Sequence, residues 1–192
     1  WVNFGAQFRT YSAFYKTFES NDKRRELLIR NYTDISGKNV ELLEDNNGKA
    51  LNDVRSFKYW PDPNGVGENM GNDIVYIRYA DVLLSRAEAL NELNGPNQES
   101  IDLINQVRQR ANTSLLKLAD YSNKLLLRDF LLAERGREFF SEGLRREDLI
   151  RHGKFIQSAK DRGYAAKEYQ VVYPIPLQQI DANPNLTQND GY

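Results

Sequence analysis

The chain has 192 residues, of which 40% are hydrophobic and 28% charged, and its formal net charge is −1. This balance is typical of one sizeable globular domain, and the near-neutral charge excludes a general electrostatic attraction to nucleic acid or to an anionic membrane. No run approaches the roughly 20 apolar residues of a membrane-spanning helix, and the absence of cysteine, with His152 as the one histidine, excludes disulfides and Cys- or His-rich metal sites in these residues.

The first 20 residues are dense in aromatic side chains. Trp1, Tyr11 and Tyr15 belong to a series of rings at steps of three and four residues, a spacing that predicts one face of a helix. Two interpretations stay open, because the rings could pack into the core or some of them could line a ligand groove. The chain begins without an initiator methionine, so we expect it to be a piece of a longer protein.

The region that follows is turn-rich. Residues 26–35 and 54–60 predict short extended segments, and the polar residues 36–53 between them predict a surface loop. Residues 61–73 form a second loop with several carboxylate and amide side chains. Their spacing does not match the calcium loop of an EF-hand, so we expect a solvated turn, with no metal and no cofactor.

Helical periodicity begins near Ile74. The expected helix ends at Gly95-Pro96, because glycine takes the left-handed closing position and proline cannot continue a helix. Asn97 is a good N-cap for the next helix. The short joint predicts an antiparallel hairpin of about 34 residues, the length of a tetratricopeptide unit. The first helix is expected to have a wide apolar stripe that is broadened by Ala80 and Leu84 and contains Tyr79, Val82, Leu83, Ala87 and Leu90.

Two further helices are predicted, over residues 122–141 with Ser122 as its cap and over residues 145–163. Residues 169–175 alternate in a strand-like way, but prolines confine them to an edge or to an extended segment. We expect the polar tail from Asn183 to be docked. The whole predicts a mainly α fold in one domain, residues 1–192, with helical hairpins of tetratricopeptide-like type, long loops and short extended segments. Its expected parts are a loop-rich part (1–73), a helical core (74–163) and an extended docked tail (164–192).

The most unusual stretch is 134–151. An apolar stripe begins at Leu127 and Leu131, and its continuation at helical spacing leads to three glutamates. Glutamate is almost never fully buried unless it is paired, so we predict helix layers held together by buried Arg–Glu pairs. The residues expected in this framework are Arg78, Glu88, Arg108, Glu134, Glu138, Glu142, Arg145 and Asp148, with Arg86 and Arg110 as further candidate partners.

These carboxylates could also suggest a glycosidase pair. Such a pair needs one carboxyl with a raised pKa in apolar surroundings. Arginines crowd the same stretch, and nearby cations lower the pKa of a carboxyl. We therefore expect no catalytic residue and no enzyme.

Five motifs in one order carry a resemblance to a known family. They are NDIVYIRYADVLLSRAEALNE (72–92), INQVRQRA (104–111), ERGREFFSEGLRREDLIRHGK (134–154), YPIP (173–176) and NPNLTQNDGY (183–192). The chain resembles the C-terminal region of the SusD/RagB family, the outer-membrane nutrient-binding lipoproteins of Bacteroidetes involved in carbohydrate uptake. The resemblance covers about residues 55–192, and residues 1–54 more loosely.

The resemblance implies a mostly helical body on the cell-surface side of the outer membrane. Such proteins capture an oligosaccharide or polysaccharide, or in some cases a peptide, for a SusC-like TonB-dependent transporter. The lipid anchor would lie outside this chain, and the family implies neither an enzyme nor a nucleic-acid partner. The family's shared motifs are framework rather than ligand site, so no binding residue is carried over from them.

Sugar capture requires exposed rings against pyranose faces, flanked by groups that bind hydroxyls. On these physical grounds the candidate ligand-binding residues are Trp60, Tyr59, Asp62, Asn64, Trp1, Tyr11 and Tyr15. Trp60 could equally be a core residue. The alternative function is a helical-repeat interaction module that binds a peptide or protein.

Overall fold

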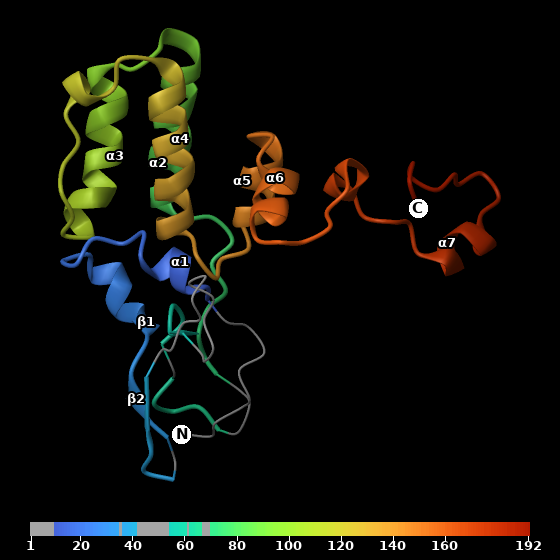
Figure 1. Ribbon diagram of the computed structural model, residues 1–192, viewed down its shortest axis with the longest axis horizontal. Coiled ribbons are helices and arrows are strands. Elements are labelled where there is room, and N and C mark those ends of the chain that lie inside the picture. The colour runs from blue at the N-terminus through green and yellow to red at the C-terminus, as the bar shows by residue number, and fades with distance from the viewer. Residues whose placement is uncertain (1–9, 35, 42–53, 61, 67–69) are drawn as a thin grey trace. The chain divides into compact units, whose positions relative to one another are not determined.

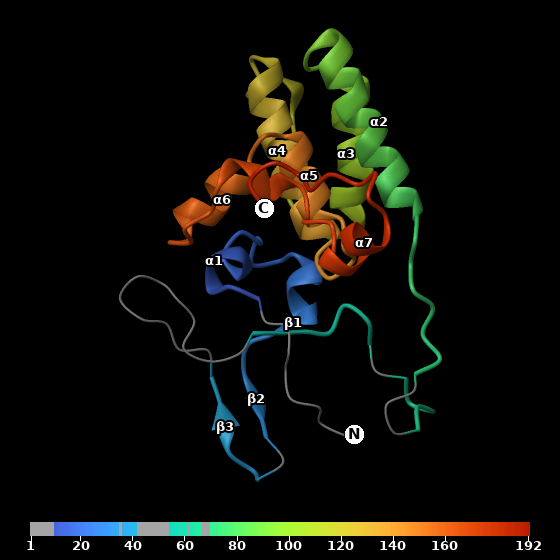
Figure 2. The ribbon, with the colours of Figure 1, turned by 90° about the vertical axis from the view of Figure 1, so that its right-hand side faces the viewer.

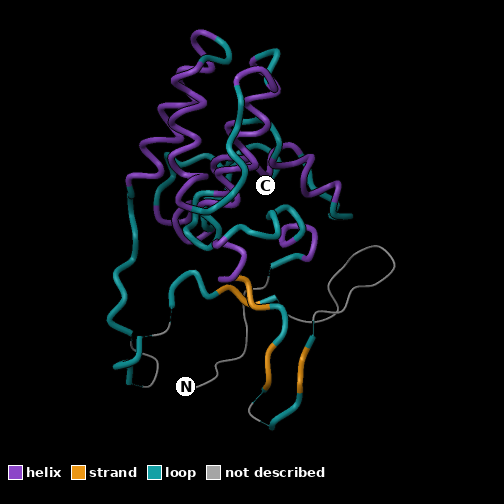
Figure 3. The backbone as a smooth tube through the Cα atoms, turned by 90° about the vertical axis from the view of Figure 1, so that its left-hand side faces the viewer, coloured by secondary structure: helices purple, strands orange, loops and turns teal. Residues whose placement is uncertain are grey.

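The structure is a computed structural model that describes residues 10–34, 36–41, 54–60, 62–66 and 70–192 (Figure 1). The chain forms two compact units, Trp1–Glu142 and Gly143–Tyr192. Helices dominate and the strands are only two residues long (Figure 3). This confirms the mainly α fold. Among the described helices, none combines the length and the apolar character needed to span a membrane.

The core of the first unit is built from three helices, α2 (Tyr79–Asn94), α3 (Gln98–Arg110) and α4 (Lys124–Glu138). They stand side by side, with α3 and α4 both packed against α2 (Figure 2). A short 3₁₀ turn, η2 (Leu118–Asp120), lies between α3 and α4 in the sequence. The completely buried apolar side chains of these helices are Leu84, Ala87, Ile101, Ile104, Leu127 and Leu131.

The ends of these helices follow local sequence signals. Gly95 closes α2 at a φ of 77°, and the Asn97 side chain accepts a hydrogen bond from the backbone amide of Ser100 at the start of α3. This confirms the predicted hairpin. The predicted cap of α4 is wrong by one residue, because Asn123 rather than Ser122 accepts hydrogen bonds from two backbone amides of the first turn.

The start and the buried face of α2 differ from the prediction. The helix begins at Tyr79 instead of near Ile74. Tyr79 and Val82, expected in the buried stripe, are 71% and 52% exposed, whereas Leu83 and Leu84, also expected there, are buried as predicted. The buried face is therefore the edge of the predicted stripe that contains Leu84, because a wide apolar stripe does not fix which of its edges is buried.

In the described residues before these helices, the elements are short. They are α1 (Ser12–Tyr15), the 3₁₀ helix η1 (Lys23–Leu27), and the strands β1 (Leu28–Ile29), β2 (Tyr32–Thr33), β3 (Asn39–Val40) and β4 (Arg55–Ser56). Antiparallel pairing joins β1 to β4 and β2 to β3. The predicted long aromatic helix is wrong for the described part, where α1 is a single turn; residues 1–9, including Trp1, lie outside the described residues. Phe18, Leu28, Val54 and Phe140 form a small core cluster.

The second unit contains α5 (Arg145–Arg151), α6 (Phe155–Asp161), the 3₁₀ helix η3 (Glu168–Val171) and α7 (Leu177–Ala182). The single helix predicted over 145–163 is wrong, because Gly153, at a φ of 65°, separates α5 from α6. The alternation at 169–175 does not form a strand, since its first half is η3.

The tail folds back on the segment that precedes α7. The Gln188 side chain exchanges hydrogen bonds with the backbone of Ile175, at 2.8 and 2.9 Å. The Tyr192 hydroxyl donates to the carbonyl of Val172 at 2.9 Å. Because side chains, rather than a strand ladder, make these contacts, the tail is held without regular structure.

Candidate functional site

Two glutamates lie at the centre of a charged cluster in the first unit. The side chains of Glu134 and Glu138 are completely buried on α4. Removing two carboxylates from water is costly, and this cost is offset here by close pairing with guanidinium groups. The arginines that contact them are Arg24, Arg78, Arg108, Arg110 and Arg137.

Arg24 joins the two glutamates. One terminal nitrogen of its guanidinium group lies 2.8 Å from a Glu134 oxygen and 3.0 Å from a Glu138 oxygen. The other terminal nitrogen of the guanidinium group donates a hydrogen bond to the Asp22 carboxylate, at 2.7 Å. Sequence reasoning missed this residue. Arg24 is 110 positions from Glu134 in the chain, so no local spacing relates the two.

Arg78 and Arg108 extend the cluster in two directions. Arg78, at the N-terminal end of α2, contacts Glu138 and also Glu142, at 2.7 Å. Arg108, on α3, contacts Glu134 at 2.8 Å and Glu19 at 2.6 Å. The helices α2 and α3 and the N-terminal region are thereby tied to α4.

The other predicted framework residues lie elsewhere. Arg86 is not a core partner, because it pairs with Glu99 on the surface, where the Arg86 side chain is 63% exposed.

Glu88 is half-buried on α2, and its negative charge raises the pKa of Arg128. In the second unit, Arg145 is exposed and Asp148 is buried and paired with Arg151.

The electrostatics of the cluster do not suit proton transfer. Burial alone would raise the pKa of Glu134 and Glu138, but the surrounding guanidinium groups outweigh it, Arg24 foremost for Glu134 and Arg78 for Glu138. The net result is a pKa below the ordinary 4.5 for both carboxyls. A general acid needs the opposite shift.

The candidate ring Trp60 lies at the end of the extended segment 54–60. It is 56% exposed, and its ring contacts Phe57 in a tilted arrangement with centroids 5.8 Å apart. Tyr59 beside it is half-buried, and Asn64 is exposed. Trp60 therefore presents a large apolar ring at the surface, and residues close to it in the sequence carry groups that can bind hydroxyls.

Asp62 organises the loop after Trp60. Its carboxylate accepts hydrogen bonds from the backbone amides of Asn64, at 2.8 Å, and of Gly71, at 2.9 Å. These bonds lower the pKa of Asp62. Gly71 approaches so closely that an added Cβ would lie 3.0 Å from the Asp62 oxygen. Asp62 thus shapes the loop, in addition to any contact with a ligand.

The remaining candidates are separate from Trp60 in the sequence and belong to α1 or its cap. Tyr11 is 48% exposed, and Tyr15 is half-buried beneath the guanidinium group of Arg25. Trp1 lies outside the described residues. Among the residues that the structure describes, no group of three or more His, Asp or Glu side chains is placed to hold a metal.

Comparison with known proteins gives a family for this chain. The model of the SusD family matches residues 5–170. The starch-binding protein SusD of Bacteroides thetaiotaomicron is 34% identical over 128 residues, which are 62% of this chain and 22% of that protein. The SusD-like protein P25 of Formosa agariphila is 33% identical over 188 residues, 91% of this chain and 32% of that protein.

A solved structure supports the same fold. The surface glycan-binding protein A of Bacteroides thetaiotaomicron, in complex with laminarihexaose, matches with a TM-score of 0.59 at 22% identity. The match covers 91% of this chain and 39% of that one. At this identity the likeness concerns the fold alone.

Proposed function

Because this chain belongs to the SusD family, we propose that it is part of a protein that captures oligosaccharides at the cell surface, with Trp60 as a stacking surface for a sugar ring. The chain spans only 22% and 32% of the two curated relatives described above. The activity of the whole protein is therefore part of the proposal.

One observation supports Trp60 above the other candidates. It is a large ring that is more than half exposed at the end of a segment fixed to the protein interior. Two residues before it, the Lys58 amine donates to the backbone carbonyl of Glu138 at 2.7 Å and pairs with Glu142 at 3.0 Å. An exposed ring on a fixed backbone presents its apolar face to a pyranose without first leaving a core.

We extend the proposal to the partners that the family resemblance implies. The captured saccharide would pass to a SusC-like TonB-dependent transporter, and the protein would be held at the outer membrane by a lipid anchor outside this chain. Binding rather than catalysis is supported by the lowered pKa of Glu134 and Glu138, since neither carboxyl is poised to donate a proton at neutral pH.

The test is a glycan-array screen with the full-length protein, followed by calorimetry on each glycan that binds. We expect Trp60→Ala to weaken binding at least tenfold, about 1.4 kcal/mol, while Trp60→Phe, which keeps a ring, retains part of the affinity. Tyr76→Ala serves as the matched control, because Tyr76 is also an exposed ring, at 91% exposure. Full binding by a folded Trp60→Ala variant would remove Trp60 from the site.

A second function, binding of a peptide or protein, is favoured by one surface. Apolar residues are exposed along the segment before α2 and on its first turn. This apolar surface contains Ile74 (89%), Tyr76 (91%), Ile77 (67%), Tyr79 (71%) and Val82 (52%). Several large apolar side chains exposed so close together in the sequence are unusual for a free surface and suit an interface. Loss of a protein partner, but not of glycan, on Tyr76→Ala would support this function.

A further inference from the structure

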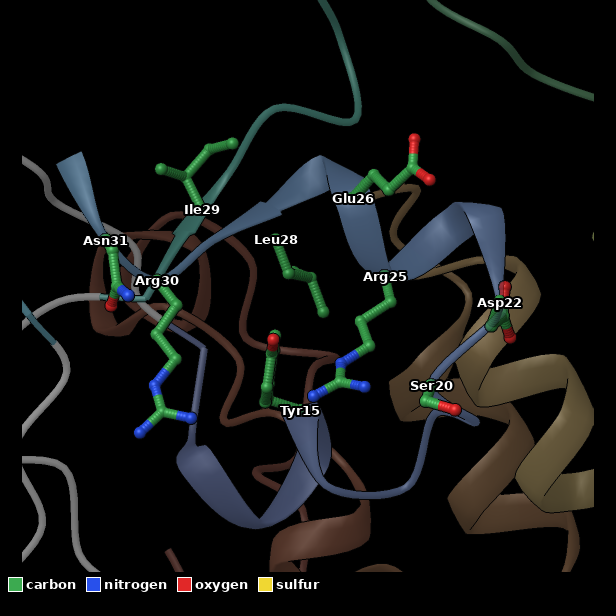
Figure 4. A pocket seen from close by; sticks show the side chains of 9 residues that line it. All are labelled: Tyr15, Ser20, Asp22, Arg25, Glu26, Leu28, Ile29, Arg30 and Asn31. Carbon is green, nitrogen blue, oxygen red and sulfur yellow. The ribbon is translucent and has the colours of Figure 1, made fainter.

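A pocket lies in the N-terminal region, away from Trp60 in the sequence. It is an open hollow of about 410 Å³, within the range of small-molecule sites. Figure 4 shows the side chains that line it, from α1, η1 and β1 and the residues around them. Its lining residues that enter the argument are Tyr15, Ser20, Asp22, Arg25, Arg30 and Asn31.

Two arginines stand on either side of one ring in this pocket. The guanidinium group of Arg25 lies 4.5 Å from the centre of the Tyr15 ring, and that of Arg30 lies 5.9 Å from it. Figure 4 shows the ring of Tyr15 between the two. An arginine stacked on a ring uses its flat face, so its N–H groups remain directed outward in the plane of the guanidinium group.

Neither arginine has a carboxylate partner among the described residues. Two acidic residues line the pocket, and one of them, Asp22, is paired with Arg24 at 2.7 Å. Glu26 also lines the pocket, but it is exposed and its carboxylate points away from the guanidinium groups of Arg25 and Arg30 (Figure 4). The Nε atom of Arg25 is buried without a hydrogen-bond acceptor. A buried donor without an acceptor is costly, and a ligand oxygen would supply the missing acceptor.

We propose that this pocket binds the anionic group of an acidic sugar, a carboxylate or a sulfate ester, through Arg25 and Arg30. Charge-assisted hydrogen bonds from arginine to such oxygens are strong and match a planar carboxylate in two-point geometry. Ser20 and Asn31, which also line the pocket, offer polar groups for neighbouring hydroxyls. The inference rests on the proposed function and names an acidic class of saccharide for it.

The experiment compares neutral, carboxylated and sulfated oligosaccharides on the full-length protein, with laminarihexaose and an oligogalacturonate among the probes. We expect an acidic glycan to bind, and Arg30→Gln and Arg25→Gln each to weaken it about tenfold or more, while affinity for neutral glycans is unchanged. The matched control is Arg86→Gln, which removes the same charge from an exposed arginine on α2. Raising the NaCl concentration should weaken the binding of the acidic glycan and leave the binding of neutral glycans unchanged.

The outcomes separate the two proposals. If neutral glycans bind and acidic ones do not, or if acidic glycans bind equally well to the arginine variants, the pocket inference is overturned and the proposed function stands. If no glycan of any class binds, both are overturned. Arg30 is exposed, so Arg30→Gln should fold and give a clear result even if Arg25→Gln does not. A preference for carboxylated over sulfated probes, or the reverse, identifies the anionic group.

Discussion

The first unit contains two regions that use polar and aromatic residues in opposite ways. Around α4, Glu134 and Glu138 are completely buried and each contacts several arginines. In the segment that ends at Trp60, the ring faces solvent and the nearby carboxylate of Asp62 holds backbone amides. The region whose sequence most suggests acid–base chemistry therefore serves packing, and the plainer loop presents a surface that a ligand can reach.

This difference has a physical cause. A carboxylate at neutral pH is useful for catalysis only if its environment raises its pKa, and five guanidinium groups around Glu134 and Glu138 do the reverse. A ring, in contrast, needs only exposure and a fixed position to stack on a sugar. The predictions below test each half of this comparison.

The largest expected effect is from Glu138→Ala. The substitution removes one buried carboxylate from the guanidinium groups of Arg24 and Arg78 and leaves an excess of positive charge in the cluster, so we expect a loss of about 3–5 kcal/mol in the free energy of unfolding. Urea denaturation measures it. Glu99→Ala, which breaks the exposed pair with Arg86, should cost less than about 1 kcal/mol. A loss below about 0.5 kcal/mol for Glu138→Ala would contradict a framework role.

The second effect is a pH dependence of stability. The pKa of Glu134 and of Glu138 is lower in the folded chain than the ordinary 4.5. Their contribution is therefore fully present above pH 4.5 and is lost as the pH falls below it towards the folded pKa values. Urea midpoints measured from pH 7 down to pH 3 should therefore decrease as the pH falls below about 4.5. The profile should be flatter for Glu134→Gln, and an identical profile would contradict the prediction.

A smaller effect is expected at the loop. Asp62→Ala removes the acceptor for the amides of Asn64 and Gly71, so the loop should lose part of its order. We expect glycan affinity to fall about threefold by calorimetry, because ordering the loop on binding becomes part of the cost. Asp62→Asn keeps one acceptor oxygen, so its affinity for the glycan should fall less. Equal losses for the two variants would indicate that the charge itself contacts the ligand.

The smallest effect is expected at the tail of the second unit. Tyr192→Phe removes the hydrogen bond to the carbonyl of Val172, which should cost about 0.5–1 kcal/mol of local stability. Hydrogen exchange of the backbone around Asn183 should become faster in this variant. Rapid proteolytic removal of the tail from the unmodified folded protein would show that the tail is not docked.

Local features of the fold were predictable from the sequence. The hairpin of α2 and α3 followed from Gly95 and from the cap at Asn97, because both signals act within one helical turn. The placement of glutamates on an otherwise apolar face of α4 followed from helical spacing. The exposed faces of Tyr79 and Val82 did not follow, since their burial depends on which neighbour the helix meets.

The long-range parts of the candidate sites were not predictable. Arg24 lies in a short basic run that resembles a surface feature, yet it is 5% exposed and bonded to Glu134 across 110 positions. The pairing of Arg25 and Arg30 around Tyr15 likewise depends on η1 and β1 turning the chain back over α1. Only a fold brings such residues together, so a single sequence offers no spacing from which to infer them.

The attachment of the segment before Trp60 affects how a ligand would be bound. Ser141 adopts a left-handed backbone, with a φ of 61°, and its hydroxyl lies 2.8 Å from that of Ser56, while Lys58 is bound to the end of α4. The backbone leading to the ring is thus immobilised when the protein folds. A sugar that stacks on Trp60 would lose little further conformational entropy in the protein, so even a small contact area could give a measurable affinity and a fast association rate.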